Sequence, residues 1–146
     1  MSRLTVVCGP PCSGKSTYVA ERAEPGEIVL DFDVLYAGLT GLELYERADR
    51  PEVARAVWAG YFALVDRIRH DRSLKGWAIL TGPARKTRSR FHAEGAHVVL
   101  LEVAREECLR RLADSDRPDT AKVQWRAFID EWFDEYEPDD RDVVIR

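Results

Sequence analysis

Short apolar runs recur along the chain and alternate with stretches in which apolar residues have helical spacing. The runs are Leu4–Cys8, Ile28–Leu30, Trp77–Leu80, Val98–Val103 and Val143–Ile145. Continuous runs of this length are typical of strands whose two faces are both covered, as in a parallel sheet. We therefore predict five parallel strands.

The segments between these runs carry the helical pattern. The expected helices begin at Lys15, cover Pro51–Arg72 with proline in the first turn, run from Ala84 to just before Gly95, and cover Arg105–Ala113 and about Thr120–Tyr136. A strand–helix alternation maintained to the end of the chain predicts an α/β fold. We expect one domain over residues 1–146, built on an open, doubly wound parallel sheet of five strands.

The last expected helix has an aromatic stripe on one face and acids on the other. The stripe holds Trp125, Phe128, Ile129, Trp132 and Tyr136, and the acids are Asp130, Glu131, Asp134 and Glu135. Aromatic rings in a row can form a base-stacking platform, but the neighbouring acids would repel phosphate. We predict that the stripe packs in the core.

Composition and charge narrow the class of protein. With 146 residues the chain is long enough to bury a core, and its 22 basic against 26 acidic side chains give a net charge of -4. Proteins that hold nucleic acid by non-specific backbone attraction are basic, so any nucleic acid would be bound locally. The three cysteines form neither a complete disulfide set nor a paired metal motif, and no apolar run approaches a membrane span. We expect a cytoplasmic protein.

A glycine-rich loop follows the first expected strand. It reads Gly9, Pro10, Pro11, Cys12, Ser13, Gly14, Lys15, Ser16 and Thr17, which fits G-x-x-x-x-G-K-[ST] at every defined position. The glycines let backbone N–H groups converge on phosphate oxygens, and the following helix adds its positive end. Lys15 can reach the β- and γ-phosphates, and the Ser16 hydroxyl can bind Mg²⁺. The loop predicts binding of a nucleoside triphosphate, ATP with Mg²⁺.

Two carboxylates, Asp31 and Asp33, follow the second expected strand. Residues two apart on a strand share a side, and the carboxyl ends of the strands face the ligand crevice in an open α/β sheet. A carboxylate there can accept a proton from an attacking hydroxyl, or hold Mg²⁺ directly or through water. The alternatives are that Asp33 caps a helical turn starting at Val34 and that Asp31 supports the metal only indirectly.

The loop GPPCSGKST, the acid-bearing second strand and a late arginine-rich segment resemble polynucleotide-kinase-like P-loop kinases. Small phage-type proteins labelled AAA family ATPases or kinases, and relatives of zeta toxins and gluconate kinases, share this layout. The resemblance implies a kinase-type P-loop NTPase fold with Asp33 as general base, Asp31 as its rival for that role, and Asp31 beside the metal. Polynucleotide 5′-kinases usually carry an arginine where this chain has Tyr36, which argues against a polynucleotide acceptor.

The arginine-rich segment begins in the helix Arg105–Ala113 and continues to Pro118. The resemblance implies a lid at about residues 105–120, from which Arg111 and Arg117 close over the β- and γ-phosphates. An arginine supplied in this way is worth about 10³–10⁵ in rate in characterised nucleotide hydrolases. The alternative is a solvated helix face on which Arg110 pairs with Glu106 or Glu107.

Two weaker signals concern the segment after the third expected strand and the end of the fourth. Arg85 and Arg88, in a basic cluster at Arg85–Arg90, are candidates to bind an acceptor phosphate, with simple surface solvation as the alternative. Glu102 ends the fourth run in the manner of a metal-binding acid, although a structural role is the preferred interpretation.

These signals together predict an enzyme, a transferase that moves the γ-phosphate of ATP to a hydroxyl of a nucleotide, nucleoside or nucleic acid. Acceptor recognition is expected from Leu35–Arg50 and the basic cluster. The first alternative is a regulatory or motor NTPase that uses water as acceptor and Glu102 as its activating acid. The second is a nucleotide-binding protein without catalysis.

Overall fold

The computed structural model describes residues 3–146 and contains the expected parallel sheet. Its strands are β1 (Leu4–Cys8), β2 (Ile28–Leu30), β3 (Gly76–Leu80), β4 (His97–Leu101) and β5 (Val143–Ile145), in the order β2-β3-β1-β4-β5. The central strand β1 pairs with both β3 and β4, and Val6 lies opposite Ala78 on one side and Val98 on the other. The prediction of five parallel strands is confirmed.

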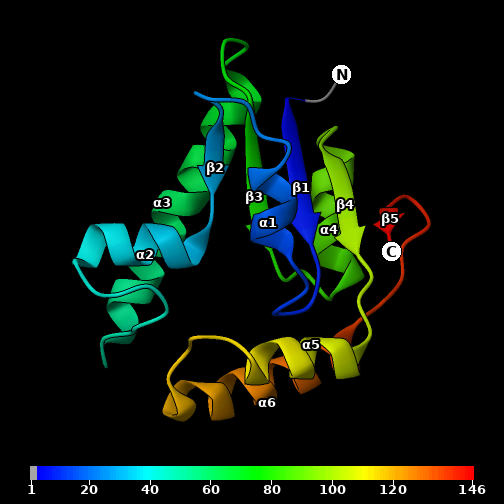
Figure 1. The fold of residues 1–146 in the computed structure, drawn as a ribbon. Helices are drawn as coiled ribbons and strands as arrows, with labels where there is room; N and C mark the ends of the chain where they lie inside the picture. Colours follow the sequence, from blue (N-terminus) through cyan, green and yellow to red (C-terminus); the bar gives the residue numbers. More distant parts are fainter. Residues whose placement is uncertain (1–2) are drawn as a thin grey trace.

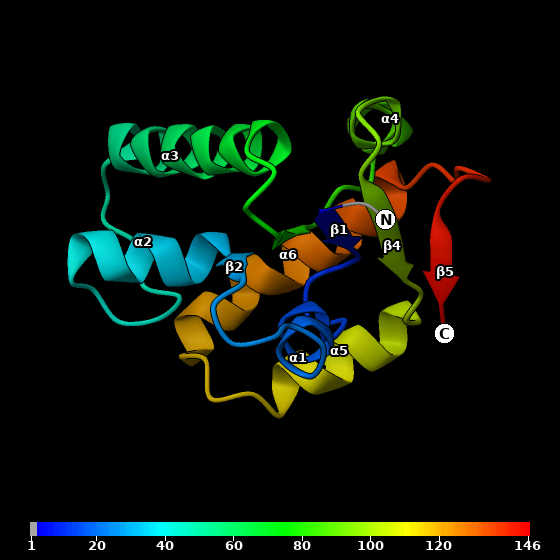
Figure 2. The ribbon, with the colours of Figure 1, turned by 90° about the horizontal axis from the view of Figure 1, so that it is seen from above.

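Six helices connect and cover these strands. They are α1 (Lys15–Ala20), α2 (Phe32–Thr40), α3 (Pro51–His70), α4 (Arg85–Ala93), α5 (Arg105–Ala113) and α6 (Asp119–Glu135). Seen from above, α3 and α4 lie on one side of the sheet, and α1 and α5 lie on the other (Figure 2). The sheet is therefore doubly wound, as predicted. No helix within residues 3–146 has both the length and the apolar character needed to cross a bilayer.

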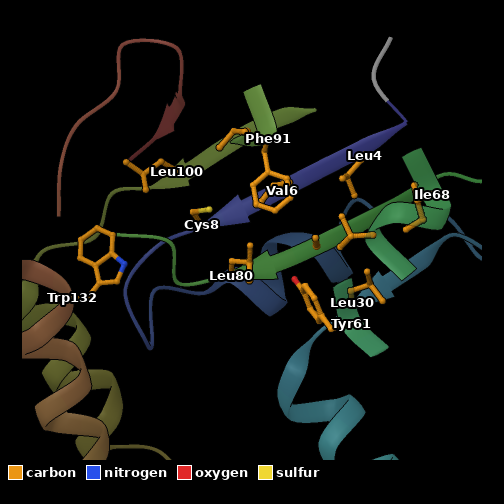
Figure 3. Close-up of a cluster of buried hydrophobic side chains, with 13 residues drawn as sticks. Leu4, Val6, Cys8, Leu30, Tyr61, Ile68, Leu80, Phe91, Leu100 and Trp132 are labelled. Carbon is orange, nitrogen blue, oxygen red and sulfur yellow. The ribbon is translucent and has the colours of Figure 1, made fainter. Parts of the chain in front are cut away.

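The core has a separate layer on each face of the sheet because successive side chains of a strand point to opposite faces. Val6 of β1 packs with Tyr61, Ile68 and Phe91 from α3 and α4 (Figure 3). On the other face Val7 packs with Val19 of α1 and with residues of β3 and β4. These two layers fix the carboxyl ends of the strands, from which the loops of the functional site emerge.

Helices α5 and α6 pack against each other beyond the carboxyl ends of the strands (Figure 1). Cys108 and Leu112 of α5 are buried against Ile129 of α6. Trp132 joins this pair to the sheet, since its indole Nε1 donates to the carbonyl of Thr81 at 2.7 Å. The pair therefore stands over the end of the sheet where a ligand crevice is expected.

Helix α2 is the one element that the sequence analysis did not predict. Strand β2 ends at Leu30, and the Asp31 carboxylate accepts from the backbone N–H of Asp33 at 3.0 Å, which caps the helix. The capping residue is thus Asp31, and the proposed cap by Asp33 is wrong. Asp33 lies in the first turn of α2 instead of on the strand, so the two carboxylates are related by a helix cap and not by strand alternation.

Arg88 of α4 is buried in the core, which contradicts its prediction as an acceptor ligand. Its side chain is 0% exposed, and its Nε donates to the Asp142 carboxylate at 2.7 Å. The remaining nitrogens donate to the carbonyls of Gly82, Pro83 and Glu137. With all three nitrogens engaged and the side chain buried, Arg88 ties the segment before β5 to α4 and is not accessible to a ligand.

Candidate active site

The phosphate loop leaves β1 at Cys8 and enters α1 at Lys15. Gly14 has a φ of 90°, a left-handed conformation that glycine adopts without strain. A side chain at Gly9 would place its Cβ 2.7 Å from Ser13 Oγ and 3.1 Å from the carbonyl of Leu101, so both neighbours would have to move. Ser13 Oγ is buried and has no hydrogen-bond partner within residues 3–146. A tight backbone cradle with one unsatisfied hydroxyl fits an anionic group such as phosphate.

Lys15 is folded back onto this loop. Its Nζ donates to the carbonyls of Pro10 at 2.7 Å and Gly9 at 3.0 Å. Burial removes water from the ammonium and lowers the pKa of Lys15 to about 8. Within residues 3–146 the hydrogen bonds of this ammonium go to neutral carbonyls, and an anion in the loop would be a stronger partner.

Ser16 and Asp31 are brought together as the sequence predicted. The Ser16 hydroxyl donates to the Asp31 carboxylate at 2.9 Å, although the residues are 15 positions apart. A hydroxyl and a carboxylate oxygen are the hard ligands that Mg²⁺ prefers. The residues present therefore fit a magnesium ion at the entrance of α1.

Asp33 lines the same cavity as the phosphate loop and forms an ion pair with Arg47. Desolvation raises the pKa of the Asp33 carboxyl, and the hydrogen bond and charge of Arg47 oppose this shift. Arg47 comes from the loop after α2, and its guanidinium lies 4.4 Å from the ring centre of Tyr36. No motif marks Arg47 in the sequence, and its role is visible only once the loop is folded over α2.

The two lid arginines of the sequence analysis both reach the phosphate loop at Cys12. Arg111 Nη1 donates to the Cys12 carbonyl at 3.3 Å, while its Nε donates to Glu107 at 3.0 Å. Arg117 Nη1 lies 3.5 Å from Cys12 Sγ, and its Nε is buried with no partner within the described chain. Both guanidinium groups are thus placed beside the loop expected to hold phosphates.

Arg110 points away from this loop. It pairs with Glu107 and Asp114 on the exposed side of α5. Together Arg110 and Arg111 lower the pKa of Glu107 to about 2. The solvated-face interpretation therefore holds for Arg110.

A cavity of about 550 Å³ brings together most of the predicted site residues, whereas Arg111 lies outside its lining. Its lining includes the phosphate loop from Pro11 to Thr17, both carboxylates Asp31 and Asp33, and Arg117. The aromatic stripe of α6 is only partly buried, and some of its side chains line this cavity. Ile129 is fully buried, whereas Trp125 and Phe128 line the cavity, so the prediction that the whole stripe packs in the core is wrong.

Three other candidates lie outside the cavity lining. The Glu102 carboxylate accepts from Arg146 at 3.1 Å and does not line the cavity. Arg85 is exposed at the start of α4 and also lies outside the lining, so its role as an acceptor ligand stays a prediction. His92, Asp139 and Asp142 come close enough to hold a cation, but Arg88 and Arg141 already pair with the two carboxylates.

Comparison with known proteins places the chain in a family. The family model described as AAA domain matches residues 4–137. A gluconokinase from Sinorhizobium meliloti 1021 superposes with a TM-score of 0.57 at 16% identity, over 97% of this chain and 80% of that one. A chain of the Pnkp1/Rnl/Hen1 RNA repair complex superposes with a TM-score of 0.53 at 16% identity, over 92% of this chain but 46% of that one. No curated protein matches in sequence.

At 16% identity these solved structures establish a shared fold. The sheet order, the loop from β1 to α1 and the helices on both faces make it the kinase-like form of the P-loop NTPase fold. Because the family model spans nearly all of the described residues, this chain belongs to the AAA domain family of P-loop proteins.

Proposed function

We propose that the protein is an ATP-dependent phosphotransferase that moves the γ-phosphate of ATP to a hydroxyl of a nucleotide, nucleoside or nucleic acid. The observation that carries the proposal is the position of Asp33. Asp33 lines the same cavity as the phosphate loop. It lies two residues after Asp31, whose carboxylate accepts from the Ser16 hydroxyl. Glu102, the acid that the NTPase alternative requires to activate water, accepts from Arg146 and lies outside this cavity, which favours the transferase.

Each polar group has a role in this reaction. The N–H groups of the loop and the ammonium of Lys15 bind the β- and γ-phosphates, which gives Lys15 a better partner than its two carbonyls. Ser16 and Asp31 would hold Mg²⁺, which supplies positive charge that neutralises the phosphate oxygens. Arg111 and Arg117 lie beside Cys12, from where they add charge to the transferred group as negative charge spreads over it.

Asp33 acts as the general base. It accepts the proton of the acceptor hydroxyl while that oxygen forms a bond to the γ-phosphorus and the bond from that phosphorus to the bridging oxygen of ADP breaks. Arg47 contacts Oδ1 of Asp33, which leaves Oδ2 to accept a hydrogen bond from the acceptor hydroxyl while the ion pair is kept. The pKa of Asp33, raised by desolvation, makes it a stronger base than an exposed aspartate.

The test is transfer of a γ-phosphate label to a panel of acceptors. The panel holds 5′-hydroxyl DNA, 5′-hydroxyl RNA, nucleosides, nucleoside monophosphates and water alone. We expect label on at least one organic acceptor, and a loss of about 10²–10⁴ in kcat for Asp33→Asn. Asp49→Asn, which changes an exposed carboxylate in the nearby loop, is the matched control. Free phosphate as the sole product, equal in both variants, would refute the proposal.

A further inference from the structure

The cavity has an aromatic wall next to Asp33. Phe32 and Trp58 stack on each other with ring centres 4.2 Å apart, and both line the cavity. Helix α6 contributes Trp125 and Phe128, whose rings meet edge to face at 5.7 Å. Aromatic side chains from three helices, α2, α3 and α6, thus converge on one space beside the candidate base.

These rings are left open to the cavity although burial would stabilise them. Phe128 is 40% exposed, whereas its neighbour Ile129 is 0% exposed. Burying a phenylalanine side chain is worth about 1.5–3 kcal/mol, so a ring kept open beside a catalytic group points to a ligand that covers it. Flat rings are covered best by another flat ring, through stacked or edge-to-face contact.

The charges around these rings select against anions. Glu131 and Glu135 of α6 line the cavity, and neither carboxylate forms an ion pair or hydrogen bond within residues 3–146. The cations of the lining are already assigned. Lys15 and Arg117 lie at the phosphate loop, and Arg47 is neutralised by Asp33. The basic segment of α4 adds no cation to the lining, since Arg88 is buried and Arg85 lies outside it.

We infer that the acceptor is an alcohol that carries an aromatic ring and no negative charge, held with its ring against Trp58 and Phe128. This inference rests on the proposed function and narrows its acceptor. A 5′-hydroxyl nucleoside meets the description, and so does an aryl alcohol that is not a nucleoside. A nucleotide, an oligonucleotide or a sugar acid brings negative charge toward Glu131 and Glu135 and is a poor acceptor.

The experiment combines label transfer with binding. The acceptors are matched pairs that differ in charge: adenosine against adenosine 3′-monophosphate, and phenylpropanediol (the alcohol with CH₂OH in place of the carboxylate) against phenyllactate. Binding is followed by tryptophan fluorescence, because three of the four tryptophans line the cavity, namely Trp58, Trp125 and Trp132. We expect the neutral member of each pair to be favoured at least about tenfold in kcat/KM and in Kd, and the two pairs tell a nucleoside from another aryl alcohol.

Substitutions in the aromatic wall test where the ring of the acceptor binds. Trp58→Leu and Phe128→Leu each remove a stacking surface, which is worth about 5- to 150-fold in KM for the acceptor, and the KM for ATP should change less than twofold. Phe128→Leu alters an exposed position and keeps the test valid if Trp58→Leu fails to fold. The control is Phe62→Leu, since Phe62 stacks on Trp58 at 5.7 Å but lies outside the cavity lining and is 46% exposed.

Removing the acids tests the charge argument. The double variant Glu131→Gln/Glu135→Gln should improve binding of the anionic members about tenfold, and Asp134→Asn on the same helix should not. Preferential transfer to an anionic acceptor would overturn the inference and leave the phosphotransferase standing. A rise in KM for ATP in Trp58→Leu and Phe128→Leu would overturn it by showing that the rings hold the base of ATP. Ring-dependent binding with only free phosphate as product would support the aromatic ligand and refute the transfer.

Discussion

Replacing Arg88 by methionine tests whether this arginine holds the fold together or binds an acceptor. Methionine keeps most of the aliphatic volume, so the change removes charge and hydrogen bonds without opening a large cavity. It takes from Asp142 a hydrogen bond of 2.7 Å and leaves the carbonyls of Gly82, Pro83 and Glu137 without this donor. Both partners of the pair have fully buried side chains, so water cannot replace what is lost.

The expected loss in the free energy of unfolding follows from the burial of both side chains. Breaking a fully buried ion pair by removing one partner costs about 3–5 kcal/mol, because the other charge stays buried without compensation. His92 still contacts Asp142 at 2.7 Å, which places the expected loss toward the lower end of that range. At this chain length about 3 kcal/mol lowers the Tm by roughly 10 °C. The double variant Arg88→Met/Asp142→Asn should recover at least about 1 kcal/mol, since it leaves no unpaired charge.

Urea unfolding followed by tryptophan fluorescence measures the free energy of unfolding, and the label-transfer assay gives the KM for the acceptor. The matched control is Arg85→Met on the same helix, which is exposed and should change stability by less than about 0.5 kcal/mol. Below the unfolding transition, Arg88→Met should keep the acceptor KM of the parent protein. A variant of unchanged stability with a raised acceptor KM would refute the structural role and reinstate Arg88 as an acceptor ligand.

Three further changes probe the phosphate loop and the base. Lys15 has a pKa of about 8 and would be held protonated by bound phosphates, so the ATP affinity measured by calorimetry should fall up to about tenfold per pH unit above pH 8. Lys15→Arg should remove this pH dependence. An ATP affinity that does not change with pH in the parent protein would contradict the prediction. Arg47 lowers the pKa of Asp33, so Arg47→Met should move the acidic limb of the kcat profile to higher pH, whereas an unmoved limb would exclude Asp33 as the base. Gly9→Ala forces a Cβ to 2.7 Å from Ser13 Oγ and should cost about 1–3 kcal/mol of ATP binding free energy. An ATP affinity equal to that of the parent protein would show that Ser13 and the loop can move without cost.

The parts of the fold that sequence predicts well depend on neighbours along the chain. The five apolar runs became the five strands because covered parallel strands need uninterrupted apolar residues, and the loop Gly9–Thr17 sits where the motif requires. Helix α2 was missed because β2 has three residues and the helix follows it after a single capping residue, Asp31. The spacing of Asp31 and Asp33 predicts a strand pair, whereas the two residues form the cap and the first turn of α2.

The missed features of the site depend on partners far away in the chain. Arg88 meets Asp142 across 54 positions, and a basic cluster gives no sign of which member will be buried. Arg47 reaches Asp33 across 14 positions from a loop without a motif. Phe128 and Ile129 belong to the same apolar stripe, yet the packing of α6 against α5 buries only Ile129. Periodicity assigns residues to a face of a helix and does not say what that face meets.

Arg117 joins three parts of the molecule through one side chain. Its guanidinium lies 4.1 Å from the ring centre of Tyr45 and 4.7 Å from that of Trp125, and it reaches Cys12 of the phosphate loop. A ligand in the phosphate loop that draws this cation toward itself must also change its contacts with the loop after α2 and with α6. If those contacts change the affinity of a compound bound between the two elements, thermodynamic reciprocity requires that the compound change the affinity of the phosphate loop by the same factor. The contacts of Arg117 thus give the phosphate loop and the aromatic wall a direct physical link, and inhibitors of one should be tested with the other both empty and occupied.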